Sequence, residues 1–254
     1  MLGILLLVSL AGGFLHSSGR PYLGLGIDLT ALELHVGAAV AVLPFVAWHV
    51  WARWVRPRPT DLARRNVLRA GSLLAMGGVA YLVLPSATRA ATGSFEIGTL
   101  QPRLLPPTQW MFDSVPALDA DNWVLRAAGR SWSYDQLAAF TDQKRATIDC
   151  TGGWYSEQDW QGVGLHRLLE HALSSDSTSF LVCSRTGYSR RLSIDEAPGM
   201  LLATRVGGIQ LDPAHGFPAR LVVPGRRGFE WVKWIDRIEV DELPAWYQSP
   251  FPLQ

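Results

Sequence analysis

One cysteine stands in a setting that favours metal binding. Cys150 is followed by Thr-Gly-Gly-Trp, where an apolar-polar stretch at 146–148 gives way to a loop. The thiolate is the form of cysteine that ligates metals, and it suits metals that take sulfur ligands. The glycines would let a bulky cofactor approach the backbone. Two other interpretations stay open: Cys150 is a small buried core residue, or it forms a disulfide with Cys183, the only other cysteine.

Four short runs, far apart in the chain, resemble one known family. DCTGGW lies at 149–154, WQGV at 160–163, HGFPARLVVPG at 215–225 and GFEWVKW at 228–234. Together they resemble the molybdenum-cofactor domain of the sulfite oxidase family, over about residues 105–245. The resemblance implies an α+β fold and a molybdenum–molybdopterin cofactor. It also implies an oxidoreductase that moves an oxygen atom to or from a small-molecule substrate in a two-electron reaction.

The same resemblance implies roles for single residues. Cys150 would ligate molybdenum, and Tyr188, in a TGY run, would hydrogen-bond the substrate, although it also fits a half-buried strand position. His215 and Arg220 match positions that contact the pterin and its phosphate, and a planar guanidinium can bond two phosphate oxygens. A Trp-Val-Lys run would close over the cofactor, and a strand-end serine is a weaker match to a pterin contact. These further residues are Trp231, Val232, Lys233 and Ser184.

Departures from the family indicate the substrate. Sulfite oxidases carry an arginine and a histidine just before a proline near the domain start, and these positions fall on Phe112 and Ser114. A site without those cations is poorly built for sulfite. The bacterial periplasmic methionine-sulfoxide reductases are a closer model, although their N-terminal pterin motif is not legible here. We therefore expect reduction of a sulfoxide-like substrate rather than oxidation of sulfite, and Arg185 or Arg190 could rebuild an anion site.

The composition indicates a membrane anchor joined to a soluble domain. The chain has 254 residues, 48% of them apolar, and a net charge of +1, which argues against a nucleic-acid partner because such a partner needs a basic face. Residues 1–85 hold long apolar runs with few acids, whereas the rest has ordinary globular composition. We therefore divide the chain into an anchor (1–89), a linker rich in Gly, Pro and Thr (90–107) and an oxidoreductase domain (108–254).

Two or three apolar runs are candidate transmembrane helices, at about residues 1–15, 29–54 and 70–85. A helix needs about 20 apolar residues to cross a bilayer, so 29–54 is the clearest span. The first run is short, and it also fits a signal-like segment or the remainder of a helix that starts upstream. Tryptophans beside arginines at the end of the second run are typical of a membrane interface. They are Trp48, Trp51 and Trp54.

Arginines gather between the second and third runs. By the positive-inside rule they place this loop in the cytoplasm, and residues 90–254 on the outer, periplasmic or extracellular, face of the cytoplasmic membrane. The run RRNVLRAG at 64–71 also resembles a twin-arginine signal, which exports folded, cofactor-loaded proteins. A basic stop-transfer loop explains the same charges equally well. The arginines are Arg53, Arg56, Arg58, Arg64, Arg65 and Arg69.

Histidines in the apolar part are candidate haem ligands. His35 and His49 are fourteen positions apart, which on a helix is about 21 Å and within about 40° of one face. This pattern resembles b-type cytochromes, in which one helix serves two haems. Each haem needs a second ligand: His16 is a candidate partner for His35, and none is left for His49. Haem b is thus a candidate second cofactor, and we expect a haem protein or a quinone-linked protein as electron-transfer partner.

The soluble part shows short strand patterns, turns and few helices, which indicates an α+β fold with much loop. Strands are predicted at 123–126, 131–134, up to Cys150, 179–183, 188–194, 221–223 and 234–240, and helices at 134–140, 164–172 and about 195–202. Two other functions stay open. One is a cofactor-free binding or structural module of the same fold. The other is a b-type cytochrome subunit with a passive outer domain.

Overall fold

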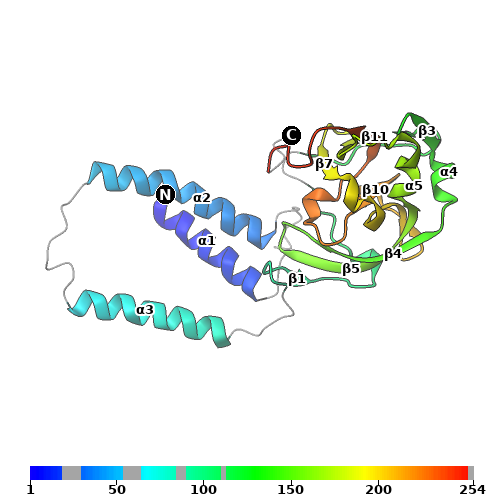
Figure 1. Cartoon of the computed structure of the whole chain (residues 1–254). Coiled ribbons are helices and arrows are strands. Elements are labelled where there is room, and N and C mark those ends of the chain that lie inside the picture. Colours follow the sequence, from blue (N-terminus) through cyan, green and yellow to red (C-terminus); the bar gives the residue numbers. More distant parts are fainter. Residues whose placement is uncertain (19–29, 54–63, 84–89, 110–112, 251–254) are drawn as a thin grey trace. The chain divides into compact units, whose positions relative to one another are not determined.

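The computed structural model describes residues 1–18, 30–53, 64–83, 90–109 and 113–250, which form two compact units, Met1–Phe95 and Glu96–Gln254. The first unit contains α1 (Leu2–Ser17), α2 (Ala31–Ala52) and α3 (Arg64–Val83). Helices α1 and α2 lie side by side (Figure 1). They approach closely because Gly12 has no side chain: a Cβ there would lie 2.9 Å from Ala31 O. Small residues allow such contacts between apolar helices.

One helix in the described residues, α2, is both long and apolar enough to cross a membrane, and Leu2–His16 forms a shorter apolar helix. These two helices match the predicted spans 1–15 and 29–54. Helix α3 begins at Arg64, before the third predicted span at 70–85, so it takes in arginines that were assigned to a loop. Trp54, Arg56 and Arg58 lie outside the described residues. Two or three transmembrane helices therefore remain a prediction.

The second unit is built on two sheets within the described residues (Figure 1). The first has the order β1-β5-β8-β10, with β4 beside β5 and β9 beside β8. Its strands are β1 (Phe95–Glu96), β4 (Asp142–Asp149), β5 (Trp154–Gly164), β8 (Leu201–Val206), β9 (Ile209–Gln210) and β10 (Arg220–Val222). Residues 96–107, which we assigned to a linker, belong to this unit.

The second sheet has the order β3-β2-β11-β6-β7. Its pairs are antiparallel except for β2 with β11, which run parallel. The strands are β2 (Val124–Ala127), β3 (Arg130–Ser133), β6 (Ser179–Ser184), β7 (Ser189–Ser193) and β11 (Ile235–Asp241). The helices of this unit are short: α4 (Tyr134–Ala138), α5 (Leu165–Leu169), and the 3-10 turns η2 (Pro102–Leu104), η3 (Glu170–Ala172), η4 (Ile194–Gly199), η5 (Pro213–His215) and η6 (Gly228–Glu230). The predicted α+β class is confirmed.

Aromatic side chains fill the core beside the first sheet. The rings of Trp160 and Trp231 meet edge to face with centroids 5.6 Å apart, and both are at most 2% exposed. Such pairs add to the free energy gained from area burial. Trp160 lies on β5 and Trp231 follows η6, so this contact joins the sheet to the segment that later forms one wall of the site.

One predicted helix differs from the structure, and one long strand was not predicted. The helix expected at about 195–202 is wrong: η4 ends at Gly199, and Leu201 and Leu202 open β8. Pro198, inside η4, lacks the N–H that a continuing helix needs. Strand β5, eleven residues long, was not predicted, because two of its inward positions are polar. Ser156 and Gln158 are fully buried, and Gln158 Nε2 donates to Ser156 Oγ (2.8 Å).

Gly162 marks an irregularity in the pairing of β5 with β8, and we predict that Gly162→Ala destabilises the domain. A Cβ at this position would lie 2.0 Å from Leu202 O and 2.8 Å from Ala203 Cα, which are backbone atoms and cannot rotate away. Forced overpacking of this kind costs about 1–3 kcal/mol or more. Chemical denaturation should show the loss. The matched control is Gly199→Ala, where a Cβ meets nothing within 4 Å; equal stability of the two variants would contradict the prediction.

Candidate active site

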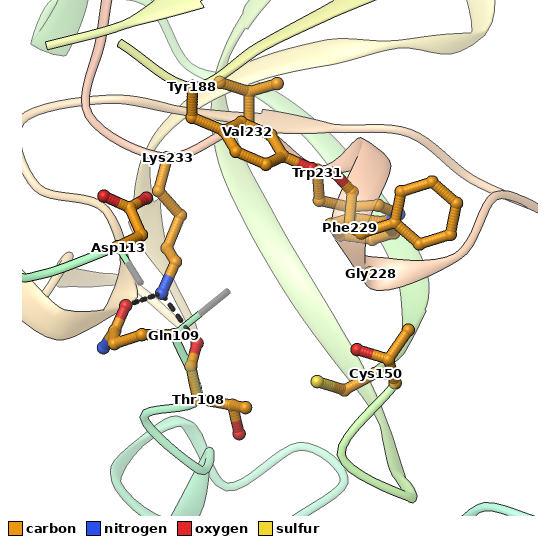
Figure 2. Close-up of a pocket in the computed structure, with 11 residues that line it drawn as sticks. Thr108, Gln109, Asp113, Cys150, Tyr188, Gly228, Phe229, Trp231, Val232 and Lys233 are labelled. Atoms are coloured by element: carbon orange, nitrogen blue, oxygen red, sulfur yellow. Dashed lines mark hydrogen bonds between the residues drawn. The ribbon is translucent and has the colours of Figure 1, made fainter. Parts of the chain in front are cut away.

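Cys150 lies directly after β4, at the start of a tight turn. Its N–H donates to Trp154 O (2.8 Å), and the Gly153 N–H donates to Cys150 O (3.1 Å). Gly153 has φ +85°, a region that favours glycine. The Gly152 N–H donates to Cys150 Sγ (3.4 Å) and orients the sulfur. The turn presents Cys150 to a cavity (Figure 2), and neither cysteine is in a disulfide, so the disulfide interpretation is wrong.

The cavity is formed by widely separated parts of the chain. Four of the residues that the resemblance singles out, Tyr188, Trp231, Val232 and Lys233, meet Cys150 there (Figure 2). The full set of lining residues is Thr108, Gln109, Asp113, Cys150, Thr151, Tyr188, Gly228, Phe229, Trp231, Val232 and Lys233.

Two of these segments are held together at Cys150. Arg227 Nη2 donates to Cys150 O (3.2 Å), and Arg227 Nη1 lies 2.9 Å from the Asp149 carboxylate. Gly228 faces the same backbone: a Cβ there would lie 3.1 Å from Cys150 Cα and 3.2 Å from Asp149 O. A side chain at 228 would therefore press on the cysteine turn, and glycine keeps the wall close to it.

Lys233 is half-buried, and its ammonium form has all three donors in use. Its Nζ donates to Thr108 O (2.9 Å), Ala214 O (2.9 Å) and Gln109 Oε1 (2.5 Å), and an ammonium has three protons. Burial, followed by the nearby Arg220 charge, lowers the pKa of Lys233 to about 7, against the opposing charges of Cys150 and Asp113. The lysine thus joins segments 108–109 and 213–215 into one wall.

Arg220 and His215 lie behind this wall and do not line the cavity. Arg220, 3% exposed, has its guanidinium carbon 5.0 Å and 5.7 Å from the ring centroids of Trp160 and Trp231. Its Nη1 donates to His215 O (3.1 Å), and its buried Nε has no hydrogen-bond partner within the described residues. Burial lowers the pKa of Arg220 to about 10, and the Cys150 charge opposes this. His215 Nε2 lies 2.8 Å from Leu105 O, and burial lowers the pKa of His215.

Tyr188 precedes β7 and is 6% exposed. Its hydroxyl donates to Phe229 O and so fastens the η6 segment to the second sheet. Burial raises the pKa of Tyr188, so the phenol stays protonated at neutral pH. Ser184 lies outside the Cys150 cavity: its Oγ is 3.0 Å from Thr186 Oγ1 and it lines a separate hollow with Cys183.

Six lining residues were not predicted as site residues: Thr151, Gly228 and Phe229 lie within the motifs that the sequence singles out, whereas Thr108, Gln109 and Asp113 lie outside them. Asp113 stands between Phe112 and Ser114, the two positions that we compared with the cations of sulfite oxidases. Because we compared only the positions of the missing cations, the Asp113 carboxylate between them was not predicted as a site residue. Phe112 lies outside the described residues, and Ser114 is exposed.

The candidate haem ligands lie on the helices of the first unit. His35 Nδ1 is 2.7 Å from Ser9 O, and its ring lies against Gly13, where a Cβ would be 2.9 Å from Nδ1. His16 is half-buried near the end of α1, and His49 is exposed near the end of α2. Haem binding remains a prediction.

A family model described as "oxidoreductase molybdopterin binding domain" matches residues 112–247. This match covers more than half of the chain and contains Cys150, Tyr188 and the 215–233 segment. The chain belongs to the molybdopterin-binding oxidoreductase family. Its resemblance to the sulfite oxidase type of this domain is confirmed.

Named relatives in this family are nitrate reductases and sulfite oxidases. An NADPH nitrate reductase of Mycosarcoma maydis is 50% identical over 67 residues, which are 26% of this chain and 7% of that protein. Sulfite oxidase of Gallus gallus is 28% identical over 201 residues, 60% of this chain and 43% of that protein. The sulfane dehydrogenase SoxCD from Paracoccus pantotrophus aligns in structure with a TM-score of 0.47 and 22% identity, over 51% of this chain and 40% of that one. The chain spans less than half the length of these relatives.

The residues present fit a molybdopterin that is held by one thiolate. Cys150 offers a sulfur ligand at the cavity wall, as softer metals prefer. Cations at Lys233 and Arg220 stand close enough for the Cys150 charge to affect the pKa of each. The unpaired Nε of Arg220 is a donor that an anionic group could take up, since buried polar groups are normally hydrogen-bonded.

Proposed function

We propose that the chain is a membrane-anchored, molybdopterin-dependent oxidoreductase. It acts outside the cytoplasmic membrane by two-electron oxygen-atom transfer, and it reduces a sulfoxide-like substrate rather than oxidising sulfite. One observation carries the proposal: Cys150, Tyr188 and Lys233 come from distant segments and line a single cavity in a molybdopterin-binding domain.

Each residue then has a definite task. Cys150 ligates the metal through Sγ; the bound group supplies a two-electron centre that takes up or releases an oxygen atom. Lys233 and Arg220 lie near enough to Cys150 for its charge to raise the pKa of each. The 231–233 segment, which lines the cavity, would contact the pterin. For His215 and Arg220, the pterin and phosphate contacts that the resemblance implies would require the bound group to reach behind this wall. Tyr188 orients the substrate side of the cavity, either directly or by holding Phe229 in place.

The cations of the site are already engaged, which supports a substrate without strong negative charge. Lys233 uses its three donors on protein oxygens, and Arg227 pairs with Asp149. An anion would have to break these contacts before it could be bound, and a buried group left without its partner costs free energy. The oxygen of a sulfoxide needs one or two donors and no net countercharge.

Turnover tests this proposal. The purified full chain, loaded with cofactor, should reduce a neutral sulfoxide when an artificial electron donor is supplied. Bound molybdenum without turnover of any sulfoxide would contradict the proposed reaction but not the proposed cofactor. Absence of molybdenum would favour the alternative of a cofactor-free module.

The proposed location gives a separate prediction. Protease added to cells stripped of their outer layers should degrade residues 90–254 and spare the segment near Arg64. The apolar helices α1 and α2 expose many aliphatic side chains, among them Leu10 and Leu43, which suits a lipid environment. Protection of the domain would contradict an outer location. Arg64→Lys combined with Arg65→Lys should keep the domain inside the cell if export uses the twin-arginine route. The same variant should leave the location of the domain unchanged if the segment is a plain anchor.

Electrons are proposed to arrive through a haem protein or a quinone-linked partner in the membrane. One contact favours a haem bound by this chain. Because His35 Nδ1 lies beside Ser9 O, Nε2 of the same ring is left as the nitrogen that can ligate iron. A reduced absorption spectrum of the purified chain tests it, because a b-type haem gives sharp bands. A featureless spectrum after haem supplementation would assign electron delivery to a separate protein.

A further inference from the structure

Among the described residues that line the Cys150 cavity, Asp113 carries the one carboxylate. The neighbouring Lys233 donates no hydrogen bond to it. Figure 2 shows the Asp113 side chain near Lys233, but the three Nζ protons go to Thr108, Gln109 and Ala214. The Asp113 carboxylate accepts a hydrogen bond from the Ser114 N–H, which lies 3.1 Å from Oδ1. Asp113 therefore keeps accepting capacity toward the cavity that it lines.

The other cations described near the site, which are arginines, do not line the cavity. Arg220 is 3% exposed, lies against two indole rings and donates to His215 O. Arg227 donates to Cys150 O and pairs with Asp149. Arg190 is also buried: it donates to Ser249 O (3.0 Å) and lies 3.7 Å from Glu230. Among the described residues that line the cavity, Lys233 and Asp113 are the two that carry charge, and of these two only Asp113 has hydrogen-bonding capacity left.

We propose that Asp113 selects substrates by charge: the site accepts oxides that are neutral or carry a positive group beside the oxide, and it rejects anionic ones. This inference rests on the proposed function and names the substrate class of the same site. A carboxylate in a partly enclosed cavity repels anions and attracts cations because field lines are focused between low-dielectric walls. Repulsion of the wrong partner is a common route to specificity.

The kinetic test uses three substrates with one reacting group. Methionine sulfoxide methyl ester is a cation, its N-acetyl derivative is neutral, and N-acetylmethionine sulfoxide is an anion. For the loaded enzyme, kcat/KM should fall in that order, with about tenfold or more between cation and anion, equivalent to about 1.4 kcal/mol. Asp113→Asn should remove most of this difference, mainly through KM, and Asp113→Glu should restore it. The matched control is Asp176→Asn, an exposed carboxylate that does not line the cavity.

A second measurement does not depend on turnover. The full chain with Cys183→Ser, made in a host without molybdopterin, leaves Cys150 as the one thiol. Its rate of reaction is measured with two methanethiosulfonate reagents, one carrying a trimethylammonium group and one a sulfonate group. The ratio of the first rate to the second, the cation-to-anion ratio, reports the charge preference of the cavity. Asp113→Asn should lower this cation-to-anion ratio about tenfold relative to the Asp176→Asn control.

An unchanged reagent ratio in Asp113→Asn overturns the inference about Asp113, whatever the enzyme reduces. A changed ratio together with failure to reduce any sulfoxide supports the charge selection and overturns the proposed reaction instead. If the three sulfoxides are reduced equally well by the wild type, charge selection is wrong although the reaction is right.

Discussion

Replacement of Cys150 by serine is expected to abolish turnover while leaving the fold and the pterin content largely intact. Among the described residues that line the cavity, Cys150 alone carries sulfur, and a hydroxyl is a poor ligand for a metal that prefers sulfur. The serine keeps the turn, because the contacts that build it run through the backbone of Cys150, Gly153 and Trp154. Steady-state rates and fluorescence of released pterin, measured on one preparation, give both quantities.

Cys183→Ser is the matched control. Cys183 lies on β6 in the other sheet, is 7% exposed and accepts from Arg237 Nη2 (3.4 Å). A structural cysteine of this kind should tolerate serine with a modest loss of stability and full turnover per folded molecule. Equal loss of activity in both variants, or full activity of Cys150→Ser, would refute the assignment of the metal ligand.

Sulfite is expected to be turned over far more slowly than by a true sulfite oxidase, and neutral sulfoxides should be the better substrates. The positions that carry cations in sulfite oxidases are Phe112 and Ser114 here, so at least two charge-assisted hydrogen bonds are missing. At about 1.5–3 kcal/mol each, their loss lowers the rate by roughly two to four orders of magnitude.

Two other arginines do not replace these cations in the structure. Arg185 pairs with Asp236 (3.6 Å) and lines a different hollow, while Arg190 is buried against Glu230. Rates on sulfite and on methionine sulfoxide, measured with the same preparation, decide the matter. Efficient sulfite oxidation would show that the cavity contains an anion-binding group other than those described above.

Much of the fold could be predicted because several strands follow the simple rule of apolar side chains facing inward. Strand β6 is an example, with Phe180 and Val182 fully buried. Strand β5 breaks the rule, since Ser156 and Gln158 point inward, where Gln158 Nε2 donates to Ser156 Oγ. The expected alternation of apolar and polar residues is lost in such a strand, so the pattern predicts a loop there. The helix predicted near 195–202 failed for a related reason, because Leu201 and Leu202 fit a helix face as well as a buried strand.

The site was predictable where a residue carries its chemistry in its type and position in a motif. Cys150, Tyr188 and the Trp-Val-Lys run line one cavity, and their roles there stay predictions. Arg220 and His215 lie behind its wall, a position that for Arg220 follows from its packing against Trp160 and Trp231. Asp113 could not be found by asking which family residues are missing, because its part in the site depends on its position beside Lys233 in the folded chain.

The central claim is that this chain holds one molybdenum through Cys150. Metal content of the purified full chain, expressed in a host that makes molybdopterin, tests it most directly. We predict about one molybdenum atom per chain in the wild type, and a loss of metal in Cys150→Ser that is greater than the loss of pterin. Wild-type protein that is folded but contains neither molybdenum nor pterin would contradict it.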